Sequence, residues 1–171
     1  MRIVEVLPYE NHWAEKFQKE AKRLKKAMPE HVKVHHIGST SVPGLAAKPI
    51  IDMIMEVTNI DKVDSWNDIF QKLGYTTKGE NGISGRRFYI HGTEEKRSYH
   101  LHVYETGNQE IMRHLSFRDY MMEHCEEAEA YATLKQELAK QFTYDVERYI
   151  EGKDAFVRER EQMALEWMKK K

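Results

Sequence analysis

The first third of the chain switches from a helical to a strand-like hydrophobic pattern. Apolar residues recur at helical spacing from Trp13 to Met28. Asn11 is a candidate N-cap, and Pro29 cannot continue a helix, so a helix is predicted over residues 11–28. The preceding RIVEVLPY is expected to form a short strand or an extended arm.

Two strands are predicted next, on either side of a glycine-containing turn. The segment VKVHHI, residues 32–37, alternates as a half-buried strand does. The segment KPIIDMIMEV, residues 48–57, is a nearly continuous apolar run interrupted by one aspartate. Its even-numbered positions share one face and its odd-numbered positions the other. Residues 38–45 form the turn between the two strands.

A helix and a three-stranded meander are expected to follow. Apolar residues at helical spacing predict a helix over 61–75, ending near Gly74. The segments YTTKG, GRRFYIHG and RSYHLHVYE are rich in aromatic and β-branched residues, and glycine-bearing turns separate them. These features are typical of consecutive short strands.

The C-terminal part of the chain is predicted to be helical. It contains no proline and a single glycine, Gly152, where the last helix could be interrupted. Helices are expected at roughly 109–123, 126–141 and 145–168. The pattern predicts an α+β fold: a mixed β-sheet with flanking helices over residues 1–107, and a C-terminal helical region over 108–171 packed on it as one compact unit.

Composition narrows the functional classes. The 171 residues are 40% hydrophobic and 32% charged, which favours a packed core over disorder. A formal net charge of -1 gives no reason to expect non-specific nucleic-acid binding. The single cysteine, Cys125, cannot form an internal disulfide and is expected to be an ordinary helix residue. Without a signal-peptide pattern or an apolar run near the roughly 20 residues of a membrane span, we expect a cytoplasmic protein with no membrane partner.

The turn GSTSVPG is a candidate anion-binding loop. Gly38 permits a close backbone approach, and amides in a tight turn can surround an anion. The hydroxyls of Ser39 and Thr40 can add donors, so these three residues are the predicted phosphate ligands. The sequence is not a Walker A loop, because no Gly-Lys-Ser/Thr follows at the required spacing. An ordinary serine-rich turn is the structural alternative.

Asp52 and two histidines are the candidate chemical groups. Asp52 lies in an apolar strand, where a carboxylate must be paired, hydrogen-bonded or metal-bound. It could hold a divalent ion or orient a nucleophilic hydroxyl; alternatively it accepts backbone hydrogen bonds or pairs with an arginine such as Arg86 or Arg87. His100 and His102 share a strand face and could be metal ligands, acid–base groups, phosphate ligands when charged, or hydrogen-bonded sheet residues. Because Arg86 and Arg87 are neighbours on a strand, only one of them can face the same cleft.

Several motifs taken together resemble the GrpB-like family. They are HIGSTSVPGLAAKPIIDMIMEV, RRFYIHG, YHLHVYE, FRDYMM, AYATLKQELA and YIEGKDAFV, and they cover nearly all of the chain in order. This family is similar to a branch of the nucleotidyltransferase superfamily with a C-terminal helical region, and it also occurs fused to dephospho-coenzyme A kinase. The resemblance implies a nucleotidyltransferase-like sheet followed by helices.

The superfamily pattern also implies a mechanism, from which this chain departs. A Gly-Ser turn holds phosphates, while an Asp-x-Asp pair and a later carboxylate hold two divalent ions. The turn and Asp52 match, but the second carboxylate position is Ile54. Glu56 lies roughly 13 Å along the strand from Asp52. It cannot share an ion with Asp52, because magnesium requires ligands at about 2.1 Å.

Histidines occupy the expected place of the third carboxylate, and three hypotheses follow. The favoured one is a nucleotidyltransferase with a rearranged site, in which Asp52, His100 and His102 act around a single magnesium, manganese or zinc ion. The second is a catalytically inactive module that binds a nucleotide or phosphorylated small molecule, and the third is an interaction domain. The predicted substrate-holding cations are Lys48, Arg86, Arg87, Lys135 and Lys153. The cleft is expected between the Asp52 face of the sheet and the C-terminal helices.

Overall fold

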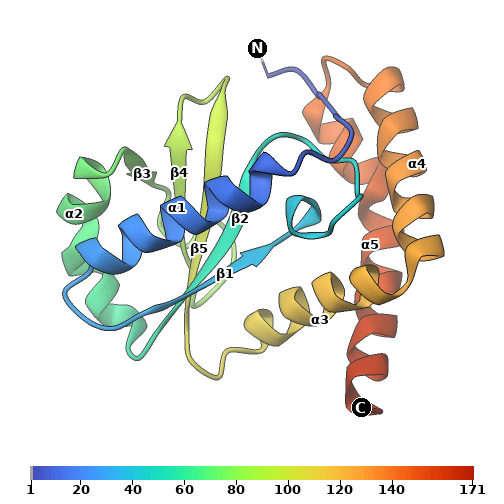
Figure 1. Cartoon of the computed structure of the whole chain (residues 1–171). Coiled ribbons are helices and arrows are strands. Elements are labelled where there is room, and N and C mark those ends of the chain that lie inside the picture. Colours follow the sequence, from blue (N-terminus) through green and yellow to red (C-terminus); the bar gives the residue numbers. More distant parts are fainter. Residues whose placement is uncertain (1) are drawn as a thin grey trace.

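A mixed five-stranded sheet forms the centre of the molecule (Figure 1). The computed structural model describes residues 2–171. The strands are β1 (Lys33–Ile37), β2 (Ile51–Val57), β3 (Tyr75–Thr77), β4 (Arg87–Gly92) and β5 (Arg97–Glu105). Their order across the sheet is β1-β2-β5-β4-β3. The β2–β5 pair is parallel and all the other pairs are antiparallel, so β3, β4 and β5 form the predicted meander.

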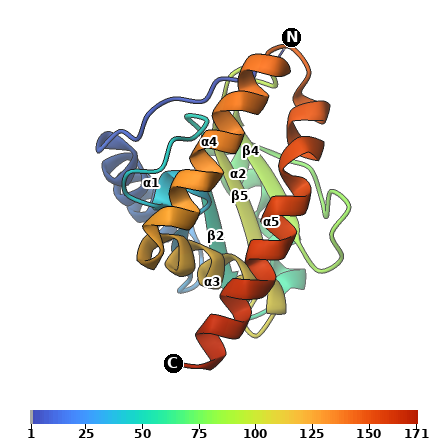
Figure 2. The same ribbon diagram turned by 90° about the vertical axis from the view of Figure 1, so that its right-hand side faces the viewer.

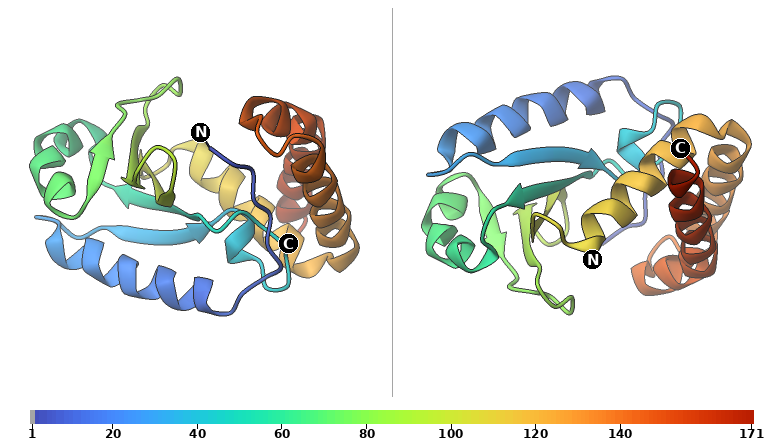
Figure 3. Two further views of the ribbon diagram at one scale, coloured as in Figure 1. Left: turned by 90° about the horizontal axis from the view of Figure 1, so that it is seen from above. Right: turned by 90° about the horizontal axis from the view of Figure 1, so that it is seen from below.

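Helices cover the sheet and extend beyond one side of it (Figures 2 and 3). The helices are α1 (His12–Ala27), η1 (Ser39–Ser41), η2 (Ile60–Trp66), α2 (Asn67–Lys72), α3 (Gln109–Glu123), α4 (Cys125–Gln141) and α5 (Val146–Lys169). The C-terminal three pack on one another, with α4 and α5 side by side (Figure 2). Within residues 2–171, no helix combines the length and the apolar character needed to cross a bilayer.

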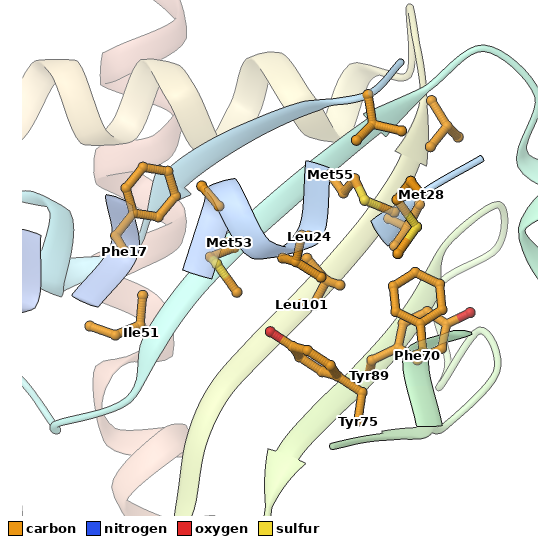
Figure 4. Packing of buried hydrophobic residues seen from close by; sticks show 14 of the residues in the cluster. Phe17, Leu24, Met28, Ile51, Met53, Met55, Phe70, Tyr75, Tyr89 and Leu101 are labelled. Atoms are coloured by element: carbon orange, nitrogen blue, oxygen red, sulfur yellow. The ribbon is translucent and has the colours of Figure 1, made fainter. Parts of the chain in front are cut away.

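The main hydrophobic core lies between α1, α2 and one face of the sheet (Figure 4). Side chains alternate between the two faces of the sheet along β2 and β5, and those of Met53, Met55 and Leu101 lie on this face. All three are completely buried. Phe17 and Leu24 of α1 pack against them. Fully burying a side chain of this size contributes about 1.5–3 kcal/mol. The even-numbered positions of β2 and β5 are therefore directed to the opposite face.

The sheet and the flanking helices confirm the predicted α+β fold, with two local differences. The helix expected over 61–75 begins as the 3-10 helix Ile60–Trp66, and only Asn67–Lys72 is α-helical. The last helix is not interrupted at Gly152. A Cβ added at Gly152 would lie 2.5 Å from Cδ2 of Leu138. Glycine is present there because α4 and α5 approach closely, not because the helix ends.

Candidate functional site

A cavity of about 610 Å³ lies where the even-numbered face of β2 and β5 meets α4 and α5. Its lining comes from both halves of the chain: Ser39, Thr40, Ala47, Lys48, Ile50, Asp52, Arg86, His100, His102, Lys135, Tyr149, Ile150 and Lys153. The expected cleft is therefore present. Every predicted site residue lines it except Gly38 and Arg87.

Gly38 lies beside the site, at the wall of a smaller cavity of about 170 Å³. The two cavities share Ser39, Asp52 and Lys153 in their linings. Gly38 has φ +71°, and an added Cβ would lie 2.9 Å from Oδ2 of Asp52. The glycine thus allows the turn to approach the carboxylate in a conformation that other residues rarely adopt.

Arg87 is directed away from the cavity. It pairs with Asp64 at 2.8 Å (Nε to Oδ1) and contacts Asp61 at 3.8 Å. Its neighbour Arg86, just before β4, lines the cavity instead. Of the two arginines, of which only one was expected to face the cleft, Arg86 therefore lines the cavity and Arg87 does not, because the Arg87 guanidinium is paired with the carboxylates of η2.

The three hydroxyls of the turn have separate partners. The Ser41 hydroxyl donates to the carbonyl oxygen of Gly38 and closes the turn. Thr40 Oγ1 lies 2.9 Å from Nε2 of His36. Only Ser39 reaches across the cavity, where its Oγ lies 2.6 Å from Nζ of Lys135. Ser39 therefore connects the phosphate-loop candidate to α4.

Two imidazoles converge on Asp52, and an arginine lies behind each of them. Asp52 Oδ1 is 3.3 Å from Nδ1 of His100 and 3.8 Å from Nε2 of His102. On the far side of each ring, Arg97 lies 3.3 Å from Nε2 of His100 and Arg86 lies 3.1 Å from Nδ1 of His102. Arginine can only donate, so a neutral imidazole accepts from it and presents its N–H to the carboxylate. The strand register places these groups together, because Asp52 pairs with His100 across β2 and β5.

The imidazoles keep Asp52 ionised. Burial alone would raise the pKa of the Asp52 carboxyl, but the contacts with His100 and His102 outweigh burial and hold that pKa well below its usual range. Burial lowers the pKa of His102, more than the nearby Asp52 raises it. The Asp52 side chain still has 32% of its surface exposed, so the ionised carboxylate faces the cavity.

This donor set does not fit the metal centre implied by the family resemblance. A two-magnesium site needs several carboxylates, and Asp52 is the single acidic residue in the lining of the larger cavity. The ring nitrogens nearest Asp52 carry protons, and arginines occupy the opposite nitrogens, so neither imidazole has a free lone pair beside Asp52. Among residues 2–171, no group of three or more histidine, cysteine, aspartate or glutamate side chains is placed to hold a metal ion. We therefore assign no step to a metal.

Lys135 is the most deeply buried lysine of the site. It is only 2% exposed, and its Nζ lies 4.3 Å from the centre of the Tyr131 ring. No carboxylate in the described part of the chain forms an ion pair with it. Burial, followed by the charges of Lys153 and Lys48, lowers the pKa of Lys135 to about 6. Its amine is therefore largely neutral at pH 7.

Tyr149 contributes to the cavity and was missed by the sequence reasoning. It is fully buried, and its hydroxyl has no hydrogen-bond partner within residues 2–171. Nζ of Lys48 and Nζ of Lys153 lie 5.3 and 5.2 Å from its ring centre. Burial lowers the pKa of Lys48 to about 8, and burial raises the pKa of Tyr149 to about 12. The spacing of Tyr149 four residues before Lys153 on a helix was the signal that could have found it.

The solved structures of Cid1 share the fold. A Cid1 structure described as an RNA terminal uridylyl transferase superposes with a TM-score of 0.54 and 12% sequence identity, covering 78% of this chain and 42% of Cid1. The complex of Cid1 with its product ApU gives a TM-score of 0.52 at 15% identity, covering 79% and 43%. These similarities confirm the predicted nucleotidyltransferase-like fold, and at such identities they concern the fold alone.

Sequence relatives are much more similar to this chain. UPF0157 protein YqkA of Bacillus subtilis is 48% identical over 169 residues, covering 98% of this chain and 49% of YqkA, so the chain spans about half of that relative. Glutamate-rich protein GrpB of Alkalihalophilus pseudofirmus is 30% identical over 159 residues, covering 90% and 91%. The crystal structure of GrpB from Enterococcus faecalis has a TM-score of 0.92 at 45% identity, covering 96% and 99%. The family model described as GrpB protein matches residues 3–163, and the chain belongs to this family.

Proposed function

We propose that this protein binds a phosphate-bearing small molecule, with nucleotides as the first candidates, in the 610 Å³ cavity. The observation that carries the proposal is the charge of the lining. Three cationic residues, Lys48, Arg86 and Lys153, and the largely neutral Lys135 face one carboxylate, Asp52. Charges of one sign gathered in a cleft raise the local concentration of oppositely charged ligands.

The lining cations either lack an ion-pairing carboxylate or are already fixed in position, and both properties favour binding of an anion. Lys153 lies beside the Tyr149 ring and has no ion-pairing carboxylate in the described chain. Arg86 is only 6% exposed, and its guanidinium donates to the carbonyl oxygens of Glu80 and Asn81 at 3.1 and 2.9 Å. A side chain that is already fixed loses little conformational entropy when a ligand binds.

The size and the remaining lining of the cavity also support a nucleotide-sized ligand. Ligand pockets commonly measure about 300–1,000 Å³, which includes this cavity. Tyr149 and Ile150 supply apolar surface, and the unpartnered hydroxyl of Tyr149 can bind a polar group of the ligand. Cid1, which shares the fold, is an RNA terminal uridylyl transferase, so uridine triphosphate joins adenosine triphosphate as a first compound to test.

Protein cations, and not magnesium, are proposed to neutralise the phosphates. The reasons are the single lining carboxylate and the arginines that occupy the imidazole nitrogens. Guanidinium and ammonium groups can offset phosphate charge directly. Binding should therefore persist when divalent ions are chelated.

A thermal-shift experiment tests the proposal. Pyrophosphate, ATP and UTP are each added with EDTA, with magnesium or with manganese. A ligand at 100 times its dissociation constant adds about 2.7 kcal/mol, which is a rise in Tm of roughly 5–10 °C for a chain of this size. Lys153→Met should lose most of the shift, while Lys140→Met, an exposed lysine outside this cavity, should keep it.

Two results would oppose the proposal. If none of these compounds changes Tm under any condition, the cavity does not bind phosphate, and the interaction-domain hypothesis is favoured. If a shift appears only with a divalent ion, the ligand is bound through a metal and the assignment to protein cations is incorrect.

A further inference from the structure

Ser39 and Lys135 form a contact that phosphate binding alone does not require. The 2.6 Å distance between Ser39 Oγ and Lys135 Nζ joins residues that are 96 positions apart in the sequence. Of the three turn hydroxyls, Ser39 is the one with neither His36 nor the turn carbonyl of Gly38 as its partner. The contact therefore leaves the Ser39 hydroxyl facing a buried amine at the cavity wall.

The chemistry of this pair changes with the protonation of the amine. As an ammonium, Lys135 donates to Ser39. As a neutral amine, it has a lone pair that can accept the Ser39 hydroxyl proton over the same distance. Burial favours the neutral form at pH 7 by lowering the pKa of Lys135 to about 6. A serine beside a neutral lysine is one of the known arrangements for activating a hydroxyl nucleophile.

The surroundings of Ser39 provide space and charge on both sides. Ser39 lies on the shared wall of the 610 and 170 Å³ cavities, together with Asp52 and Lys153. A phosphate held by Lys153 and Arg86 in the larger cavity would lie along the same wall as the Ser39 hydroxyl. Asp52 is already engaged by two imidazoles, and burial raises the pKa of the Tyr131 hydroxyl beside Ser39, so that hydroxyl stays protonated. The amine of Lys135 is therefore the neighbour of Ser39 that can accept its proton.

We infer that Ser39 is a nucleophile and Lys135 its general base, in the transfer of a phosphoryl group from a phosphoric anhydride bound in the larger cavity. Ser39 Oγ forms a bond to phosphorus while the bond from phosphorus to the leaving oxygen breaks. The Ser39 proton moves to Lys135 Nζ and then to the leaving oxygen. Water next attacks the phosphoserine and gives a proton to Lys135 while the bond from phosphorus to Ser39 Oγ breaks. Lys135 returns this proton to Ser39 Oγ, so inorganic phosphate is released and the serine and the neutral amine are restored. The choice of an anhydride rests on the proposed phosphate binding, whereas the activated serine does not.

Reaction with an alkyl fluorophosphonate tests the pair without knowledge of the natural substrate. Ser39 should displace fluoride and acquire one adduct, which intact-mass measurement and peptide mapping would locate, and Ser39→Ala should acquire none. Lys135→Arg places a hydrogen-bond donor with a permanent positive charge beside Ser39, and arginine cannot accept a proton. Its labelling rate should fall about 100-fold or more, the usual contribution of a general base. Lys140→Arg makes the same change on the exposed part of α4 and should label at the unaltered rate.

The outcomes separate the two proposals. If Lys135→Arg labels as fast as the unaltered protein, or if Ser39 does not react, the serine–lysine pair is structural, even when pyrophosphate still raises Tm. Pyrophosphate at ten times its dissociation constant should slow Ser39 labelling about tenfold by occupying the cavity. If Ser39 labels but pyrophosphate neither raises Tm nor slows the labelling, the nucleophile stands and the phosphoric anhydride assignment is overturned.

Discussion

Replacing Lys135 by methionine should stabilise the protein at neutral pH. Lys135 is almost fully buried, and its amine has no ion-pairing carboxylate in the described chain. The unfolded chain holds a proton on this lysine up to a pKa near 10.5, whereas burial lowers the folded-state pKa to about 6. At a pH between these two values, the lysine must lose its proton when the chain folds, and this loss makes folding less favourable. Methionine is unbranched, apolar and able to fill an irregular space, so it avoids this penalty.

The size of the effect follows from the two pKa values. Each pKa unit corresponds to about 1.4 kcal/mol, so the penalty at pH 7 is up to about 5 kcal/mol. The unfolded state binds more protons than the folded state over this range, so the penalty decreases as pH rises. It is greatest below pH 6 and disappears above pH 10.5. The advantage of Lys135→Met should therefore fall by about 1.4 kcal/mol for each pH unit.

Urea unfolding at several pH values between 6.5 and 9.5 measures this advantage. The quantity of interest is the difference in free energy of unfolding between Lys135→Met and the unaltered protein. Lys140→Met is the matched control, because it removes an exposed lysine from the same helix and should show no such slope. If the difference does not change with pH, Lys135 remains protonated in the folded protein. A neutral amine beside Ser39 would then be refuted.

Three further predictions concern single residues. Gly38→Ala should lower the free energy of unfolding in urea by about 1–3 kcal/mol and weaken pyrophosphate binding in calorimetry. The reason is that φ is +71° and the new Cβ would lie against Asp52. Unchanged binding would show that the turn can move away. Gly152→Ala should lower the free energy of unfolding despite the better helix propensity of alanine. In a protein that already carries Leu138→Ala, the same substitution should lower it less, because the smaller side chain makes room for the new methyl group. Equal losses in the two backgrounds would contradict this packing explanation. Arg87→Ala should leave pyrophosphate affinity unchanged in calorimetry and cost at most about 1 kcal/mol of stability, because its partners are exposed carboxylates; a large loss of affinity would return Arg87 to the site.

The parts of the site that could be predicted are those governed by strand alternation. Even-numbered residues of one strand must share a face, so the sequence places Asp52 away from the Met53 side and puts His100 and His102 together. The same rule predicted that only one member of the Arg86 and Arg87 pair could enter the cavity. The helices could be predicted from the 3.6-residue period of the apolar residues. The apolar face of α1 packs on the sheet, and α3, α4 and α5 pack on one another.

The missed features depend on contacts between distant segments. The role of Arg97 follows from its position behind His100, and only the folded sheet shows which ring nitrogen it reaches. The pairing of Ser39 with Lys135 depends on how α4 packs on the turn, and no local pattern contains that information. Gly152 was interpreted by its helix propensity, but the neighbouring Leu138 determines its role. Propensity is a local quantity, and tertiary packing overrides it in such places.

The cavity has walls from both ends of the chain, since Arg86 and Asp52 come from the sheet and Lys135 and Lys153 from the helical region. A ligand that contacts all four would act as a non-covalent cross-link between the two regions. Hydrogen exchange should then slow together in β5 and in α5 when the ligand is added, although the two segments are far apart in sequence. The sheet region alone, ending near residue 107, would keep the turn and the carboxylate but lose Lys135 and Lys153, so neither region can retain the site without the other.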